Sequence, residues 1–264
     1  MNGPVAGHDA QSPIFVTGMP RSGTTFVQHL LTTHSRITIH GQEPVGFSWG
    51  NLLKAAVHGV GFADASNEQL GYEAPHYAAP DDRDRAAVEL LDYARWYLTG
   101  GQAARRWGAK SLTQCRIAAD IISEFWPQTC WVVCIRNPFS SIQSLRNTYD
   151  KDQCVDLATL VEWWTDAVRF AHEKPAAMPV QFDRLLSESA RLAFVERLFD
   201  FVGETPTPQV IKFAEAWEVI HKVTPDDQRE YTLSNDEQQL MLTNEDFAEW
   251  VSRLGYHPLE AELV

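Results

Sequence analysis

The chain has 264 residues, of which 44% are hydrophobic, so it is long enough to bury a core as a soluble globular protein. Its 22 Lys and Arg residues against 35 Asp and Glu residues give a formal net charge of −13, which argues against a non-specific nucleic-acid binder because such proteins carry a basic surface. No apolar run approaches the roughly 20 residues of a membrane-spanning helix. Residues 1–11 lack the basic and apolar regions of a secretory signal. We expect a cytoplasmic protein, and we expect residues 1–11 to be disordered.

The first predicted elements are a strand, a glycine-containing loop and a helix. A short apolar run at residues 12–18 ends at Gly18, as a buried parallel strand does. A helical pattern follows from Thr24, since apolar side chains recur three and four residues apart. A second short apolar run predicts a strand at residues 37–40.

The next stretch, residues 45–105, has an irregular pattern rich in glycine, histidine and aromatic residues. It contains one clear helical stretch, at residues 82–98. We interpret it as a mostly helical insertion over the sheet, within a single α/β domain at residues 12–264. Loops of this kind often build a substrate pocket.

After this insertion, predicted strands again alternate with predicted helices. The pattern predicts strands at residues 106–110, 129–135 and 178–182, and helices at residues 115–125, from Pro138 onward, at 156–171, 192–202, 210–221 and 236–254. Strands separated by helices predict a three-layer α/β fold, with a parallel sheet and helices on both faces. Ligands of such folds bind at the carboxyl ends of the strands. We therefore expect the site just after Gly18, Ile39, Gly108 and Ile135.

The cysteines, Cys115, Cys130, Cys134 and Cys154, are too few for a disulfide scaffold and include no Cys-x-x-Cys pair. We expect reduced thiols. Cys130 and Cys134 lie four positions apart in a predicted strand and so on the same face, which indicates small core side chains.

The loop after the first strand has the spacing of a phosphate-binding loop. Residues 18–25 read Gly-x-x-x-x-Gly followed by two threonines at the helix start, an arrangement whose backbone N–H groups and helix dipole attract an anion. A P-loop NTPase would carry lysine where Thr24 stands. Here Arg21 lies inside the loop instead. Because that lysine serves the β- and γ-phosphates of a nucleotide triphosphate, the loop suits a ligand with a shorter anionic chain.

A second anion site is predicted where the strand at residues 129–135 ends. Arg136 follows that strand, Asn137 is a good N-cap, and Pro138 fits the first helical position. Ser144 lies about two turns into the predicted helix and can supply a hydroxyl. Taken alone, a strand-end arginine is equally typical of a surface salt bridge.

Both motifs resemble those of the sulfotransferases that use 3′-phosphoadenosine 5′-phosphosulfate (PAPS). Residues 20–26, Pro-Arg-Ser-Gly-Thr-Thr-Phe, are similar to the family's 5′-phosphosulfate loop, and Arg21 is closer to the tyrosylprotein and bacterial branches than to the cytosolic branch, which has lysine there. Arg-x-Pro with a serine eight residues after the arginine resembles the 3′-phosphate motif. Looser matches, at residues 107–111 and 181–186, extend the resemblance from about Ile14 to Tyr256.

The resemblance implies PAPS as co-substrate and 3′-phosphoadenosine 5′-phosphate as product, on a P-loop-type fold. It implies 5′-phosphosulfate ligands at Arg21, Ser22, Gly23, Thr24 and Thr25, and 3′-phosphate ligands at Arg136 and Ser144. Since ATP has no 3′-phosphate, the two motifs together favour PAPS over ATP.

Catalytic groups are expected at the same edge of the sheet. Glu43, just past the strand at residues 37–40, is the candidate base, because tyrosylprotein and bacterial sulfotransferases carry a glutamate at a similar place. Here Gln42 replaces the first glutamate of the family's Gly-Glu-Glu-like stretch, and Glu43 aligns with the second. His40 is the rival base, since the cytosolic branch uses histidine. Lys110, in a Gly-x-Lys context, and Arg21 are the candidate catalytic cations.

The remaining side chains show no metal-ligand spacing and no Gly-x-Ser-x-Gly elbow, so we expect neither a metal nor a serine nucleophile. The acceptor stays open between a small molecule, a glycan and a peptide, although the acidic charge argues against polyanionic glycans. We expect neither a nucleic-acid nor a membrane partner. The alternatives are a P-loop kinase of a small molecule and a non-catalytic nucleotide-binding protein.

Overall fold

The computed structural model describes residues 12–41, 89, 106–110, 119–147, 155–217 and 232–259. The segment at residues 1–11 and the insertion predicted at residues 45–105 lie outside the described residues, except that Glu89 is helical. Among the described residues, no helix combines the length and the apolar character needed to cross a membrane.

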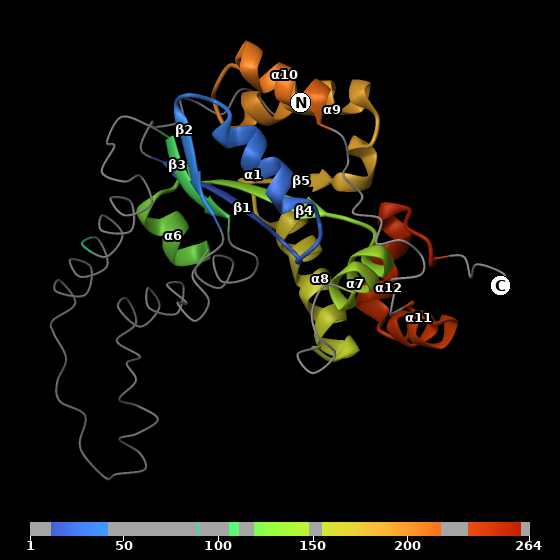
Figure 1. The fold of residues 1–264 in the computed structure, drawn as a ribbon. Helices are drawn as coiled ribbons and strands as arrows, with labels where there is room; N and C mark the ends of the chain where they lie inside the picture. The colour runs from blue at the N-terminus through green and yellow to red at the C-terminus, as the bar shows by residue number, and fades with distance from the viewer. Residues whose placement is uncertain are drawn as a thin grey trace, which may run out of the picture.

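The centre of the molecule is a parallel five-stranded sheet (Figure 1). Its strands are β1 (Ile14–Gly18), β2 (Ile37–His40), β3 (Arg106–Lys110), β4 (Cys130–Ile135) and β5 (Ala177–Gln181), in the order β2-β3-β1-β4-β5. The three inner strands are buried along their whole length, which explains the continuous apolar runs of β1 and β4, whereas β3 buries a charged residue at each end, Arg106 and Lys110. The strand order reverses at β1, and ligands of open α/β sheets bind at such a switch point.

Helices cover both faces of this sheet. One face packs against α6 (Ala119–Phe125), α7 (Pro138–Arg146), α8 (Leu157–Glu173), α11 (Asn235–Leu242) and α12 (Glu245–Leu254). The other face packs against α1 (Thr24–Thr32), α9 (Glu188–Phe201) and α10 (Pro208–Ala216). Successive residues of a strand point to opposite faces, so Phe15 joins the first core and Ile14 and Val16 join the second. The three-layer α/β fold with a parallel sheet is confirmed.

β3 fits beside β1, the middle strand of the sheet, only because Gly108 has no side chain. A Cβ atom at this position would lie 1.7 Å from the carbonyl oxygen of Ile14 in β1, far inside van der Waals contact. Gly108 therefore lets β3 approach β1 closely, and it sets the place of Lys110, two residues further along β3.

Most predicted elements form at or near their predicted residues, and the differences have local causes. Phe182, predicted to close the last strand, instead begins the 3₁₀ turn η2 (Phe182–Leu185), because its ring packs against the loop at Gly23. The helical stretch predicted at residues 236–254 is two helices, α11 and α12, because Asn244 caps a new helix by accepting from the Phe247 N–H. The helix predicted at residues 210–221 ends at Ala216.

Cys130 and Cys134 are free thiols and lie buried in the same core cluster. Burial raises the pKa of both thiols, and in Cys130 it outweighs the opposing effect of the Arg106 guanidinium. The prediction of small core side chains on one strand face is confirmed for these two residues. Cys115 and Cys154 lie outside the described residues.

Candidate functional site

The carboxyl ends of neighbouring strands bring the candidate groups to one edge of the sheet. β1, β3 and β4 end there at Gly18, Lys110 and Ile135, and β2 ends there at His40. The register pairs Val16 with Lys110, so Lys110 lies beside the start of the loop that follows β1. The predicted phosphate loop and the predicted second anion site therefore share this edge.

The loop after β1 has the tight backbone of an anion-binding turn. Gly18 and Gly23 have φ values of 146° and 93°, a region in which glycine carries no steric penalty. Arg21, with φ at 71°, is the only residue other than glycine with a positive φ among the residues that the structure describes. Such backbone strain gathers at functional sites, and it sets the direction of the Arg21 side chain.

Ser22 closes this loop from within. Its backbone N–H donates to the Met19 carbonyl oxygen over 3.2 Å, and its hydroxyl donates to the same oxygen over 2.7 Å. The side chain is 1% exposed. Of the predicted loop ligands, Ser22 is thus the one whose polar groups are already occupied inside the loop, and it holds the loop's shape.

The next backbone N–H groups are available to a ligand. Those of Gly23, Thr24 and Thr25 donate to no other residue in the part of the chain that the structure describes. They lie at the N-terminus of α1, where the helix dipole attracts negative charge, and the first turn of α1 carries no acidic residue. This is the donor set that a phosphate or sulfate group requires.

Gly23 also lets an aromatic side chain support the loop from behind. A Cβ atom here would lie 2.1 Å from Cδ2 of Phe182. Phe182 packs in turn edge-to-face on Phe26 of α1 and on Trp217 after α10. The loop is therefore held against a buried aromatic cluster.

Lys110 brings a cation to the start of α1. Its side chain is 9% exposed, and its Nζ donates to the Thr25 Oγ1 over 3.2 Å. Burial lowers the pKa of the Lys110 ammonium, because the charged form loses hydration there. The structure places this predicted catalytic cation beside the predicted loop.

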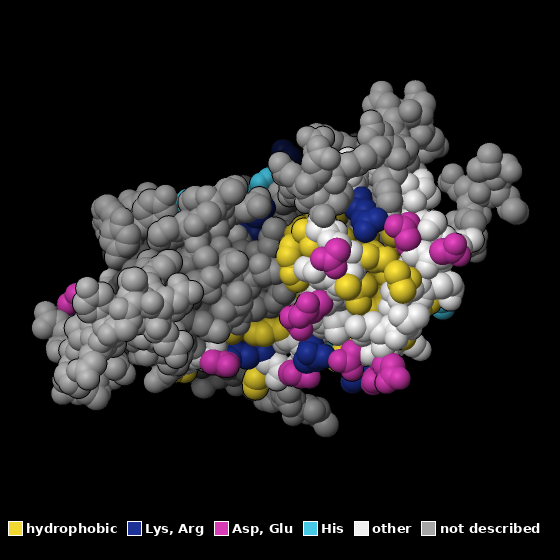
Figure 2. Space-filling model, turned by 90° about the horizontal axis from the view of Figure 1, so that it is seen from below, with side chains coloured by type: hydrophobic (Ala, Val, Ile, Leu, Met, Phe, Trp, Pro, Cys, Tyr) yellow, Lys and Arg dark blue, Asp and Glu magenta, His cyan; other side chains and the backbone are white. Residues whose placement is uncertain are grey.

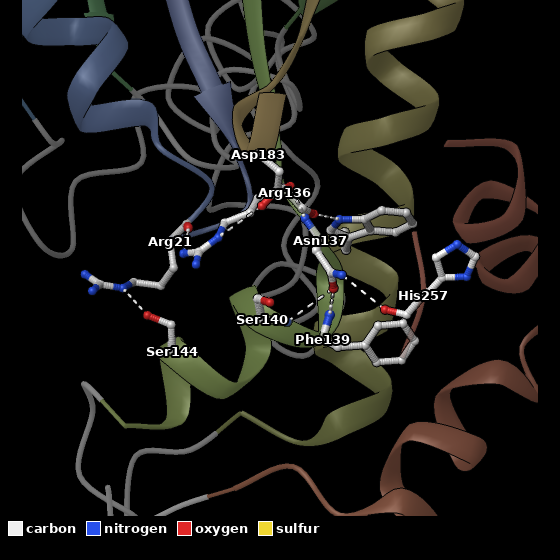
Figure 3. A network of polar contacts seen from close by, with 9 residues as sticks. Arg21, Arg136, Asn137, Phe139, Ser140, Ser144, Asp183 and His257 are labelled. Atoms are coloured by element: carbon white, nitrogen blue, oxygen red, sulfur yellow. Dashed lines mark hydrogen bonds and ion pairs between the residues drawn. The ribbon is translucent and has the colours of Figure 1, made fainter. Parts of the chain in front are cut away.

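The start of α7, where the second anion site is predicted, has the cap that its sequence predicts (Figure 3). Asn137 caps α7: its Oδ1 accepts from the backbone N–H groups of Phe139 and Ser140 at 3.0 and 3.3 Å. Pro138 occupies the first turn, where a missing N–H costs nothing. Arg136 lies between the end of β4 and this helix N-terminus.

Arg21 joins the two predicted anion regions. Its Nε donates to the Ser144 Oγ over 3.1 Å, and its backbone carbonyl oxygen accepts from an N–H of Arg136 over 3.3 Å. Figure 3 shows Arg21 between Ser144 and Arg136. The structure thus brings together three of the predicted ligands, from the loop after β1, from the end of β4 and from α7.

Asp183, in η2, is the polar residue that the sequence analysis missed. One carboxylate oxygen lies 3.7 Å from Nε of Arg136, and the other accepts from the Asn137 N–H over 2.8 Å. Burial lowers the pKa of Arg136, and the Asp183 carboxylate acts in the opposite direction. A signal was present, since Asp183 follows a predicted strand and so belongs to the same edge of the sheet.

Of the two candidate bases, only His40 lies among the residues that the structure describes. His40 ends β2 at this edge, half-buried, with its Nδ1 3.3 Å from the Gly41 carbonyl oxygen. Glu43 lies outside the described residues, so its role stays a prediction. Within the described ranges, no three His, Cys, Asp or Glu side chains are grouped so as to hold a metal ion.

Comparison with known proteins identifies what this architecture is similar to. The sequence profile of the sulfotransferase family matches residues 13–209, most of the chain. An uncharacterized protein of Aquifex aeolicus (strain VF5) is 44% identical over 55 residues, which are 21% of this chain. The chain covers 7% of that relative's length.

Two solved structures share the fold. The sulfotransferase domain of the Synechococcus PCC 7002 olefin synthase gives a TM-score of 0.52 at 14% identity, covering 97% of this chain and 98% of that domain. A sulfotransferase from Mycobacterium avium gives a TM-score of 0.52 at 14% identity, covering 95% of this chain and 78% of that one.

Proposed function

The chain belongs to the sulfotransferase family, and on that premise we propose that it transfers the sulfuryl group of PAPS to a hydroxyl or amine of an acceptor. The observation that carries the proposal is the pair of hydrogen bonds through which Arg21 connects the loop after β1 to Ser144 and Arg136. An adenosine bearing anionic groups at both its 5′ and 3′ positions needs two anion sites side by side.

The described residues suit the two ends of such a ligand. The N–H groups of Gly23, Thr24 and Thr25 would hold the 5′-phosphosulfate at the N-terminus of α1. The guanidinium of Arg136 and the hydroxyl of Ser144 would hold the 3′-phosphate. Ser22 would contribute through the loop's shape, because its own polar groups bond to Met19.

The proposed reaction is an in-line displacement at sulfur. The acceptor oxygen or nitrogen forms a bond to sulfur while the bond between sulfur and the 5′-phosphate oxygen breaks. The acceptor proton passes to Glu43, the products being the sulfated acceptor and 3′-phosphoadenosine 5′-phosphate. Lys110 and Arg21 stabilise the negative charge that develops on the leaving phosphate oxygen, by analogy with phosphoryl transfer.

The acceptor class is a small molecule, a glycan or a peptide, and the formal net charge of −13 disfavours a polyanionic glycan. A nucleic-acid or membrane partner is not part of the proposal. We place the reaction in the cytoplasm, where the free thiols Cys130 and Cys134 would stay reduced.

Sulfate transfer from labelled PAPS to a panel of phenols, alcohols, amines and sugars tests the activity. We expect turnover that persists in excess EDTA. Turnover that requires both Mg²⁺ and ATP would instead make the protein a small-molecule kinase. PAPS binding without transfer to any acceptor would make it a non-catalytic nucleotide-binding protein.

The donor is tested by calorimetry with 3′-phosphoadenosine 5′-phosphate and with AMP. We expect the bisphosphate to bind more tightly, and Arg136→Ala to remove most of the difference. A charge-assisted hydrogen bond contributes about 1.5–3 kcal/mol, and each 1.4 kcal/mol is about tenfold in affinity. Equal affinities in the wild type would refute the 3′-phosphate site.

A further inference from the structure

A carboxylate beside a phosphate site needs an explanation. Asp183 lies 3.7 Å from Arg136, the residue that the proposed function assigns to the 3′-phosphate. A fixed negative charge at this distance repels an approaching anion and partly neutralises the arginine. Electrostatics alone therefore makes Asp183 unfavourable for ligand binding, unless it contributes something that outweighs the repulsion.

The contribution is visible in how the Arg136 side chain is held. Its Nε faces Asp183, and its NH1 donates to the Arg21 carbonyl oxygen over 3.3 Å. The guanidinium is thus held at its Nε and at its NH1. The other N–H groups of its NH1 and NH2 donate to no residue in the part of the chain that the structure describes. These groups form the end of the fork that binds an anion through two parallel hydrogen bonds.

Asp183 fixes the neighbouring backbone with its second oxygen. That oxygen accepts from the Asn137 N–H over 2.8 Å, and the Trp164 Nε1–H donates to the Arg136 carbonyl oxygen over 2.9 Å. The Asn137 Nδ2–H donates to the His257 carbonyl oxygen over 3.1 Å. The peptide unit that carries Arg136 into α7 is therefore held on both sides.

Tyr256 supports Asp183 from the C-terminal segment that follows α12. Its hydroxyl is buried near Asp183, in a contact that falls short of ordinary hydrogen-bond geometry. Burial, reinforced by the charge of Asp183, raises the pKa of the Tyr256 hydroxyl above its usual value. Tyr256 thus stays neutral and adds no second negative charge beside the site.

We propose that Asp183 is a positioning residue for the 3′-phosphate: it holds Arg136 with the free end of its guanidinium toward the ligand and makes the site selective for 3′-phosphorylated nucleotides. The proposal rests on the proposed function. It also predicts a sign opposite to that of simple electrostatics, because removing a negative charge near the site should weaken the binding of an anion.

The test is calorimetric titration of Asp183→Asn with 3′-phosphoadenosine 5′-phosphate and with AMP. Asparagine keeps an oxygen for the Asn137 N–H and removes the charge that orients Arg136. We expect affinity for the bisphosphate to fall by about tenfold while affinity for AMP stays within about twofold, a selective loss that a general folding defect would not give. Asp183→Glu, which keeps the charge, should retain part of the preference.

Two controls isolate the mechanism. In an Arg136→Ala background, Asp183→Asn should leave the ratio of the two affinities unchanged, because the residue to be positioned is gone. Asp120→Asn removes the same charge from an exposed ion pair with Lys174, which precedes β5 at the opposite edge of the sheet, and should leave both affinities unchanged.

The proposal is overturned if Asp183→Asn binds the bisphosphate as tightly as the wild type or more tightly. It is also overturned if Asp183→Asn lowers the ratio equally with and without Arg136. If Asp183→Asn does not fold, Asp183→Glu provides the test. The proposal is contradicted if Asp183→Glu loses the preference for the bisphosphate over AMP as completely as Arg136→Ala does. A wild type that does not distinguish the bisphosphate from AMP would refute the proposed function itself, whereas a preserved preference in Asp183→Asn refutes the positioning role alone.

Discussion

Arg21 and Ser144 lie 123 positions apart in the chain, and the Nε–H of the first donates to the hydroxyl oxygen of the second over 3.1 Å. Arg21 belongs to the loop after β1, whereas Ser144 lies two turns into α7. The contact places the hydroxyl at the boundary between the two predicted anion regions. A serine hydroxyl can accept one hydrogen bond and donate another, so under the proposed function the Ser144 hydroxyl, which accepts from Arg21, would donate to a phosphate oxygen.

Ser144→Ala should therefore weaken binding of 3′-phosphoadenosine 5′-phosphate and leave AMP binding nearly unchanged. We expect a loss of about twofold to tenfold, the range for one hydrogen bond of about 0.5–1.5 kcal/mol. Calorimetry with both nucleotides measures it. Ser140→Ala, which removes a hydroxyl from the preceding turn of α7, is the matched control and should change neither affinity. A parallel loss for AMP would mean that Ser144 shapes the loop rather than binds the 3′-phosphate.

Lys110 should give the rate an alkaline limb. An ammonium is charged below its pKa, so its stabilisation is complete at low pH and is lost as the pH rises through that pKa. Because burial lowers the pKa of Lys110, the fall begins at a lower pH than for an ordinary lysine. Lys110→Arg should move the limb upward and Lys110→Met should cost about 10²-fold in turnover. Lys174→Met, which removes a lysine at the opposite edge of the sheet, is the control. If the alkaline limb is unchanged in Lys110→Arg, the limb does not arise from Lys110.

Glu43→Gln and His40→Ala, assayed side by side with one acceptor, identify the base. We expect Glu43→Gln to lower turnover by about 10²–10⁴, the usual contribution of a general base, and to abolish the acidic limb of the pH–rate profile. Its affinity for the bisphosphate should stay nearly unchanged, because a carboxylate adds nothing favourable to an anion. His40→Ala should do less. A fully active Glu43→Gln beside an inactive His40→Ala would assign the base to His40.

Gly23→Ala should destabilise the loop and the fold together. The added methyl would meet the Phe182 ring at 2.1 Å, on top of the strain of φ at 93°. Gly255→Ala measures the strain of a positive φ without the steric contact, because Gly255 has φ at 72° and no atom lies within 4 Å of an added Cβ. Gly255→Ala should cost about 1 kcal/mol of unfolding free energy, and Gly23→Ala clearly more. Chemical denaturation of both variants measures the difference, and equal losses would mean that the Phe182 ring moves aside freely.

The parts of the molecule that local pattern decides were predictable. The cap at Asn137 and the first turn at Pro138 follow from preferences that act within a few residues, so the start of α7 was predicted correctly. β1 and β4 were found because buried parallel strands are short apolar runs bounded by turn residues. The carboxyl-edge rule then placed Arg136 and Lys110 near the loop.

What escaped prediction depends on residues distant in sequence. The apolar run at residues 178–182 fits a strand or a turn equally well, and only the packing of Phe182 on Gly23 ends β5 at Gln181. Asp183 reads locally as an ordinary solvated carboxylate, and its partner Asn137 lies 46 positions away. No local pattern encodes a contact of that kind.

The hydrogen bond between Asn137 and His257 has a consequence for folding during synthesis. The carbonyl that receives the Asn137 side chain is synthesised 120 residues later, at about 5–20 residues per second. The loop after β1 therefore leaves the ribosome long before α12 and Tyr256 exist to support the strand end beside it. A nascent chain that ends before this segment has the residues that we propose as phosphate ligands but lacks the contacts of His257 and Tyr256. Under the proposed function, we therefore expect tight nucleotide binding only once the C-terminal segment has docked.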